Sequence, residues 1–300
     1  MGTRLGNLDL RSPLIAACGT VGSVVDFAAV TDLAIYGAAV AKSVSGTPWP
    51  GRQPPRVAAT GTGMLNGIGI QNPGVDAWVE EIGPGLESLP VPVWGSAVGR
   101  DADEYARVAG HLSSSSVAAV EVNLSCPNLE NGRMFALDAG PAAAVVRAVR
   151  AATTLPIGAK LTPNSEDIVA VAAAVAEAGA DWVVLGNTVW GAGFDIETRR
   201  PLLSGVVGGY SGAPIKPIAL RCVWEVSRAL PGLPIVGIGG AGSGADVVEF
   251  LLAGASAVGI GTAHFASPRI GTRIIAQLHR YMSKHGVRSL GELIGAVEPW

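Results

Sequence analysis

Short apolar runs recur along the chain, separated by segments with a different periodicity. Each run is apolar at nearly every position, which is typical of parallel strands buried on both faces. The segments between them space their apolar residues three and four positions apart, which predicts helices with one apolar face. We expect strands at Leu14–Cys18, Ala38–Lys42, Val93–Ala97, Ala119–Asn123, Ile157–Leu161, Trp182–Gly186, Ile235–Ile238 and Ala257–Ile260. We expect helices at 24–35, 72–83, 101–112, 139–153, 165–178, 214–229, 243–253 and 269–283.

This alternation of eight strands with eight helices predicts an α/β protein, a (β/α)8 TIM barrel. A local repeat supports the prediction, because residues 178–186 (AGADWVVLG) and 253–261 (AGASAVGIG) share one pattern. In both segments a Gly ends a helix and a strand follows at once. No break in composition divides the chain, so we expect residues 1–300 to form a single domain.

Two connections are longer than a minimal barrel needs. Residues 43–71 and 187–213 are rich in Gly and follow predicted strands. Long loops in compact domains usually carry function. We expect both to be insertions that rise from the C-terminal face, where barrel active sites lie.

Charge and cysteine content exclude several classes of protein. The net charge of −3 argues against a nucleic-acid partner. No apolar run reaches the ~18 residues of a membrane span, and the N-terminus shows no secretory signal. Three widely spaced cysteines make no disulfide framework, and four histidines offer little for a metal site or a His-based triad. We expect a soluble, cytoplasmic protein without a metal site.

Polar residues at predicted strand ends indicate a site. Lys42, Asn123, Lys160 and Asn187 follow or end four different strands, and a closed barrel brings such positions to one rim. A single buried Lys could simply reach a loop carbonyl. Two lysines together with two asparagines favour a site for an anionic or electron-rich ligand, because a buried ammonium is costly without a partner.

The last two predicted strands end in glycines, in the segments Gly237–Gly240 and Gly259–Thr262. Glycines make tight turns, but they also let backbone N–H groups approach a phosphate, and these two loops are the usual phosphate site of a barrel. We therefore expect a phosphorylated substrate or a cofactor that carries phosphate.

Three further motifs carry candidate chemistry. The sharpest is Asn123–Asn128 (NLSCPN), in which Cys126 is a nucleophile, a base or, as is commoner for Cys, a small buried side chain. Met64–Gly74 has backbone groups to line a ligand or to form an ordinary turn. Gly208–Pro217 leads a loop into a helix whose first N–H groups are free.

These motifs, in this order, resemble those of the dihydroorotate dehydrogenases of the soluble, cysteine-using class. The resemblance runs from about Leu5 to at least Phe265. The membrane-associated class has Ser at the position of Cys126 and an N-terminal extension. Met64–Gly74 and Asp195–Lys216 look more like the NAD-linked class 1B catalytic subunit than the fumarate-using branch.

The resemblance implies a single FMN-binding TIM-barrel domain that oxidises dihydroorotate to orotate in de novo pyrimidine biosynthesis. Cys126 would be the base that removes the C5 proton, and the C6 hydride would pass to the flavin. By the same match, the substrate would contact Lys42, Asn66, Gly67, Ile68, Gly69, Ile70, Asn123, Asn128, Asn187 and Thr188. The flavin would contact Cys18, Lys42, Ser43, Ser96, Asn123, Lys160, Gly186, Gly212, Gly239, Gly240, Gly261 and Thr262.

Three of these positions depart from the family pattern. Cys18 stands where Ser is usual, Ser96 replaces an Asn, and Gly186 replaces a larger apolar residue beside the flavin. Ser96 and Gly186 keep open a second reading, a flavin enzyme of the same family that acts on another pyrimidine-like compound. Two further alternatives are a lyase or isomerase that forms a Schiff base on Lys42 or Lys160, and a barrel that binds FMN only as an interaction module.

Electron transfer implies a partner. The chain lacks the four clustered cysteines of an iron–sulfur centre. The resemblance to the NAD-linked branch implies a separate iron–sulfur and FAD subunit that passes electrons to NAD, within a homodimer or a heterotetramer.

Overall fold

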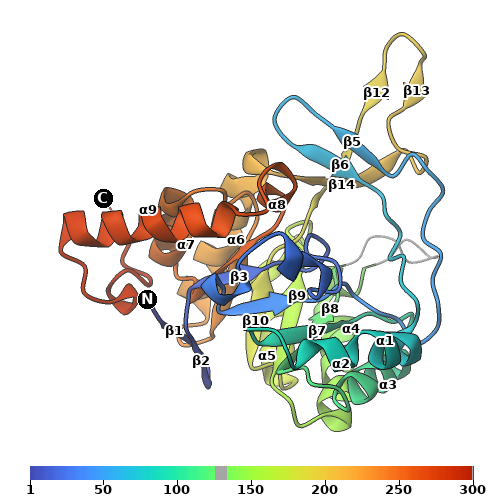
Figure 1. Ribbon diagram of the computed structural model, residues 1–300, viewed down its shortest axis with the longest axis horizontal. Helices are drawn as coiled ribbons and strands as arrows, with labels where there is room; N and C mark the ends of the chain where they lie inside the picture. The colour runs from blue at the N-terminus through green and yellow to red at the C-terminus, as the bar shows by residue number, and fades with distance from the viewer. Residues whose placement is uncertain (126–133, 299) are drawn as a thin grey trace.

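The computed structural model describes residues 1–125, 134–298 and 300. Its centre is a closed barrel of eight parallel strands that follow one another around the ring in chain order (Figure 1). Each strand lies within its predicted range, so the predicted (β/α)8 barrel is confirmed. The strands are β3 (Leu14–Ala16), β4 (Ala38–Val40), β7 (Val93–Ala97), β8 (Ala119–Asn123), β9 (Ile157–Leu161), β10 (Trp182–Leu185), β15 (Ile235–Ile238) and β16 (Ala257–Ile260).

Helices surround the barrel, and several begin where a side chain caps them. Asp101, Asp167 and Ser243 each accept a hydrogen bond from a backbone N–H in the first turn of the helix that follows. The helices are α1 (Val75–Glu81), α2 (Gly83–Leu86), α3 (Ala102–Leu112), α4 (Ala139–Ala152), α5 (Ile168–Glu177), α6 (Lys216–Ala229), α7 (Gly244–Ala253), α8 (Ala263–Ala266) and α9 (Ile270–His285). Three short 3-10 helices, η3 (Phe135–Leu137), η4 (Ala213–Ile215) and η5 (Leu290–Glu292), lie in connections.

The helix predicted at 24–35 is wrong. This segment forms two separate 3-10 helices, η1 (Asp26–Ala29) and η2 (Leu33–Ile35). Asp32 has an extended backbone between them, and its side chain accepts a hydrogen bond from Ala34 N. A short polar side chain that bonds to the backbone in this way competes with a continuous helix.

The repeated Ala-Gly-Ala segments do end helices, as predicted. Gly254 follows α7 with φ +116°, and its N–H donates to Leu251 O. Gly179 follows α5 with φ +108°. Only Gly adopts this left-handed conformation without steric cost, so each glycine turns the chain directly into the next strand.

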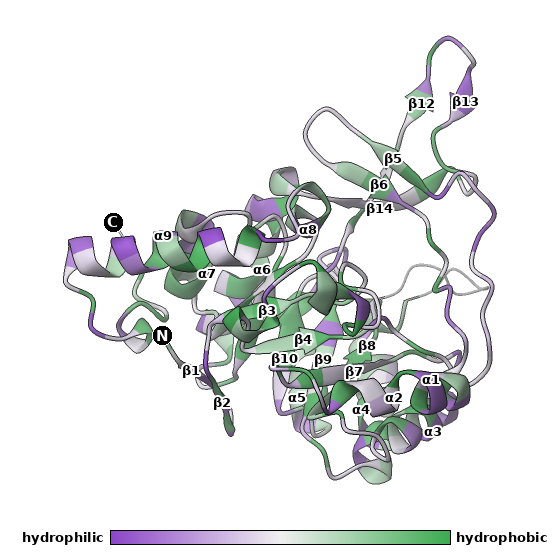
Figure 2. Ribbon diagram, in the orientation of Figure 1, coloured by the Kyte–Doolittle hydropathy of each residue, from purple (hydrophilic) through white to green (hydrophobic). Residues whose placement is uncertain are grey.

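Apolar side chains fill the barrel interior from its N-terminal end. Trp94 and Trp182 are buried there with ring centroids 4.9 Å apart. The hairpin of β1 (Thr3–Leu5) and β2 (Leu8–Leu10) adds Leu5 and Leu10 to the same cluster. Figure 2 shows the barrel strands as mostly hydrophobic. With this end closed by apolar contacts, polar groups collect at the opposite rim, which we call the mouth.

The two long loops meet each other above the mouth. Residues 43–71 contain β5 (Val57–Ala59) and β6 (Met64–Asn66), and residues 187–213 contain β11 (Val189–Ala192) and β14 (Val207–Ser211). These strands form one antiparallel sheet in the order β11-β14-β6-β5. A small hairpin, β12 (Phe194–Asp195) and β13 (Arg200–Pro201), extends from it (Figure 1). The expected insertions at the C-terminal face are therefore present.

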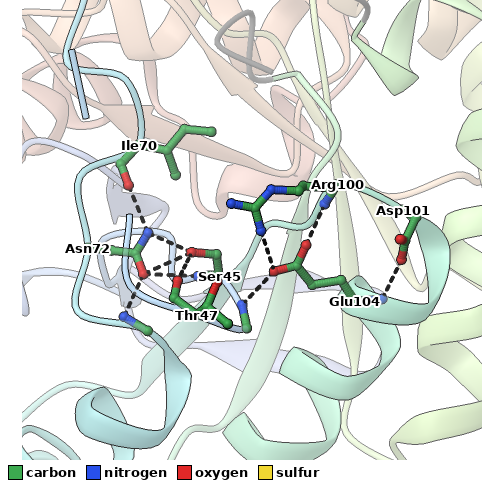
Figure 3. Close-up of polar contacts among 9 residues, drawn as sticks. Ser45, Thr47, Ile70, Asn72, Arg100, Asp101 and Glu104 are labelled. Atoms are coloured by element: carbon green, nitrogen blue, oxygen red, sulfur yellow. Dashed lines mark hydrogen bonds and ion pairs between the residues drawn. The ribbon is translucent and has the colours of Figure 1, made fainter. Parts of the chain in front are cut away.

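Buried side chains tie the ends of the first loop to the barrel (Figure 3). Glu104 of α3 accepts hydrogen bonds from Gly46 N (3.0 Å) and Arg100 N (2.8 Å). Asn72 accepts from Ser45 N (3.1 Å) and donates to Ile70 O (2.8 Å). The loop therefore leaves and returns at defined positions.

None of the helices in the described part of the chain is long and apolar enough to cross a membrane.

Candidate active site

A chain of hydrogen bonds crosses the mouth and joins two of the predicted asparagines. Asn123, the last residue of β8, donates from Nδ2 to Ser43 Oγ at 3.0 Å. Its Oδ1 accepts from Ser125 Oγ at 3.1 Å. Asn187 Nδ2 in turn donates to Ser125 Oγ at 2.6 Å. Asn123 and Asn187 are thus brought together through a serine, and both amides are held in defined orientations.

Ser43 is the meeting point of a second group of predicted residues. Its hydroxyl lies 2.9 Å from Ser96 Oγ and 3.4 Å from Cys18 Sγ. Ser43 and Ser96 are both 1% exposed. Cys18, Ser43 and Ser96, all predicted to contact a flavin, therefore form one cluster beside Asn123.

Lys160 lies in the barrel next to this cluster. Its backbone is in register with Asn123, and its Nζ is 3.5 Å from Glu121 Oε1. Both side chains are nearly inaccessible to solvent. Burial raises the pKa of the Glu121 carboxyl, and the neighbouring Lys160 opposes that shift. The other predicted cation, Lys42, is half-buried two residues beyond β4.

The predicted glycines gather on the other side of the mouth. Gly240, after β15, has φ +80°, and a Cβ there would lie 2.9 Å from Gly212 O and Lys216 N. Gly239 adjoins it, and Gly261 has open space around it, with no atom closer than 3.8 Å to the position of a Cβ. Thr262 Oγ1 donates to Ser211 Oγ at 2.9 Å. This arrangement forms a cradle of small residues in which backbone N–H groups can approach an anion.

Asn66 and Thr188 meet on the sheet of the two loops. Asn66 Nδ2 donates to Gly209 O at 3.3 Å, and a Cβ at Gly209 would collide with Thr188 Oγ1. Residues 67–70 continue from Asn66, and Gly67 donates to Arg56 O. Gly186 follows β10 directly and lies against Pro163.

Cys126 and Asn128 lie outside the described residues. The predictions that they act as base and as substrate contact stay predictions. The described chain ends on their N-terminal side at Ser125, which is 2% exposed and belongs to the hydrogen-bonded chain across the mouth.

Sequence reasoning missed three residues of the site. Ser125 bridges the two asparagines, Glu121 pairs with Lys160, and Asn164 donates to Thr188 O at 3.1 Å and accepts from Trp190 N at 3.0 Å. Glu121 carried a signal, because it is an acidic residue inside an otherwise apolar run. Ser125 lies within the NLSCPN motif, although no contact was assigned to it, and Asn164 carried no signal, since asparagine is an ordinary loop residue.

His264 lies behind the cradle, buried between two hydroxyl groups. Thr20 Oγ1 donates to Ala17 O, so it accepts from His264 Nδ1 at 3.1 Å. His264 Nε2 then accepts from Tyr36 Oη at 2.8 Å. Burial lowers the pKa of His264 from 6.5 to about 4 and raises that of Tyr36. The imidazole is therefore neutral in the folded protein at neutral pH.

Comparison with known proteins gives one consistent result. Residues 1–282 match the family model described as dihydroorotate dehydrogenase. The chain is 44% identical over 300 residues to the "Dihydroorotate dehydrogenase B (NAD(+)), catalytic subunit" of Citrifermentans bemidjiense, covering 99% of this chain and 98% of that protein. It is 45% identical over 294 residues to the protein of the same name from Desulforudis audaxviator, covering 97% and 95%.

The fold is also found among solved structures. A crystal structure of DHODH from Eimeria tenella, in complex with ferulenol, matches with a TM-score of 0.82 and 19% identity. The match covers 98% of this chain and 88% of that one. At this identity the likeness shows the shared barrel fold.

The buried imidazole predicts a pH dependence of stability. The unfolded chain protonates His264 near pH 6.5 and the folded protein only near pH 4, so the unfolded state binds more protons between these values. The free energy of unfolding should therefore fall as the pH drops through this window, by about 3 kcal/mol from this group. His264→Gln should remove that part of the loss, measured by urea unfolding at pH 7 and pH 4.5.

The exposed His279 gives the matched control, because His279→Gln should keep the pH dependence of the unchanged protein. An equal loss of stability in His264→Gln and the unchanged protein would contradict the assignment.

Proposed function

Because the chain belongs to the dihydroorotate dehydrogenase family, we propose that it is an FMN-dependent catalytic subunit of the NAD-linked type. It is an oxidoreductase that converts dihydroorotate to orotate in pyrimidine biosynthesis. The observation that carries the proposal is the hydrogen-bonded chain from Ser43 to Asn187, which lies beside the buried Lys160 at the barrel mouth.

The residues at the mouth fit FMN. The cofactor needs a cradle for its phosphate and polar partners for the pyrimidine side of its ring. Gly239, Gly240 and Gly261 supply a cradle from residues that carry no side chain of their own, and Ser43 and Lys160 supply a hydroxyl and a cation within the barrel. When bound, FMN accepts the two electrons that are removed from dihydroorotate.

The asparagines suit the substrate. Dihydroorotate is a small ring with amide N–H and C=O groups and a carboxylate, and an Asn side chain both donates and accepts hydrogen bonds. Asn123 and Asn187 are held through Ser125, and Asn66 is held by β14, so little side-chain freedom remains to be lost on binding. The half-buried Lys42 supplies positive charge to the carboxylate and to charge that develops on a ring carbonyl.

Cys126 is the proposed base. A C–H bond beside a carbonyl is a weak acid, so its removal needs a positioned base whose pKa is near the working pH. The thiolate of Cys126, one residue beyond Ser125, would take the C5 proton while the loops exclude water.

A Schiff base on Lys160 has less support. An amine must be neutral to attack a carbonyl. Lys160 lies 3.5 Å from the Glu121 carboxylate, which favours the charged ammonium. The pair is therefore suited to electrostatic stabilisation rather than to nucleophilic attack.

A partner subunit completes the proposed electron path. The relatives carry the words "catalytic subunit" and "NAD(+)" in their names, which supports a second subunit that reduces NAD. Three cysteines in this chain are too few for an iron–sulfur centre of its own. We propose an FAD and iron–sulfur subunit as that partner, and rapid NAD reduction by this chain alone would contradict it.

The glycine cradle gives a prediction about cofactor affinity. Gly240→Ala puts a methyl group against Gly212 O and Lys216 N at a backbone φ that Ala disfavours, so the cradle must distort. We expect at least a tenfold rise in the dissociation constant of FMN, measured by fluorescence titration of the flavin-free protein. Gly242→Ala, in the same loop but with no neighbour closer than 3.9 Å, should bind FMN normally. Equal affinity in both variants would show that the cradle does not hold the phosphate.

The chemistry gives a second prediction. Cys126→Ala should lower turnover of dihydroorotate with an artificial electron acceptor by roughly 10²- to 10⁴-fold, because the base is lost. The purified variant should keep its bound flavin and its yellow colour. Cys222→Ala, a change at a buried thiol on α6, is the matched control and should keep turnover. Near-normal turnover in Cys126→Ala would exclude Cys126 as the base.

A further inference from the structure

The barrel interior contains an ion pair that the proposed reaction does not yet use. Among the described residues, the buried carboxylates are Glu104 and Glu121, and the buried ammonium is Lys160. Glu121 and Lys160 lie on the neighbouring strands β8 and β9, with Oε1 and Nζ 3.5 Å apart. Both groups were removed from water during folding, which costs several kcal/mol per ion before their attraction is counted. Such a pair needs an explanation beyond stability.

The two buried carboxylates are held in different ways. Glu104 accepts hydrogen bonds from two backbone N–H groups and from the Arg100 side chain, so it anchors a loop (Figure 3). Apart from Lys160, Glu121 Oε1 has no hydrogen-bond partner in the described part of the chain. Its charge is balanced by Lys160 rather than by backbone dipoles. The Glu121 carboxylate is therefore stabilised mainly by the positive charge of the Lys160 side chain.

The position of the pair places it directly below the mouth. Side chains two residues apart on a strand point to the same face, so Glu121 lies one layer deeper in the barrel than Asn123. Lys160 is in register with Asn123, whose amide donates to Ser43. The pair thus separates the polar mouth from the apolar layer of Trp94 and Trp182.

We infer that Glu121 is a positioning residue for the reaction: it holds the Lys160 ammonium below the mouth and offsets part of its charge. In this way it sets how strongly the site favours the reduced, negatively charged flavin over the oxidised one. The inference rests on the proposed function, which places FMN beside Lys160.

Electrostatics gives the direction of the effect. With Glu121 ionised, the flavin meets a cation whose charge is partly cancelled. Glu121→Gln keeps the shape of the side chain and removes a negative charge beside the ammonium, so the negatively charged flavin is bound more strongly. Without Lys160, the charge that lowers the pKa of the Glu121 carboxyl is gone while burial still raises it, so the ionised form is less favoured and Gln replaces less negative charge.

The test is a double-mutant cycle read by the midpoint potential of the bound flavin. Glu121→Gln should change the ratio of affinities for reduced and oxidised flavin about tenfold in favour of the reduced form, a rise of about 30 mV for a two-electron couple. In a Lys160→Met background the same substitution should shift the potential clearly less. Non-additivity of this kind is the signature of a residue that acts through another.

A matched control separates this role from a structural one. Glu104→Gln removes the other buried carboxylate and should lower the melting temperature while leaving the potential unchanged. If Glu121→Gln does not fold, Glu121→Asp replaces it, since a shorter carboxylate draws back from Lys160 and should raise the potential in the same direction.

The outcomes distinguish the two proposals. A potential that Glu121→Gln or Glu121→Asp leaves unchanged, or an equal shift with and without Lys160, would overturn the role of Glu121 while the bound flavin still supports the proposed function. An unchanged protein that binds no FMN on titration would overturn the proposed function itself, and this inference with it.

Discussion

Parallel closure of the barrel is the constraint on which the site depends. Because all eight strands run in the same direction, their carboxyl ends share one rim, and residues far apart in the chain meet there. Ser43, Asn123 and Asn187 follow or end three different strands and are joined through hydrogen bonds. The opposite end is filled by apolar side chains, so a polar group inside the barrel has one end at which it can meet a ligand.

The two long loops restrict the conformational freedom of the binding residues at this rim. Asn66 and Thr188 come from different loops, yet both lie against Gly209 of β14. Glu104 and Asn72 hold the ends of the first loop through backbone N–H and C=O groups. Binding residues on loops usually lose entropy when a ligand orders them, and here backbone pairing between the loops has already ordered them.

The barrel was readable from the sequence because its strands are buried on both faces and therefore appear as unbroken apolar runs. The helix predicted at 24–35 was wrong, because apolar spacing alone does not distinguish a continuous helix from two 3-10 helices separated by a capping residue such as Asp32. The residue types at the mouth, Asn123 and Lys160 above all, were also readable, since strand ends in a barrel converge.

The hydrogen-bond partners of these side chains could not be predicted from the sequence. Which hydroxyl meets which amide depends on strand register and on side-chain rotamers, and neither leaves a mark in composition. The role of Ser125 follows only from its hydrogen bonds to Asn123 and Asn187, which the fold brings to it from the ends of two different strands. The pairing of β6 with β14 joins segments more than a hundred residues apart, and no local pattern predicts such a contact.

That pairing also constrains how the protein can change over evolution. An insertion of one residue in either β6 or β14 would slip the ladder and turn Asn66 or its neighbours to the opposite face. The two long loops, residues 43–71 and 187–213, are therefore inherited as a single unit. Transferring one of them alone into a relative would break the strand register that both share.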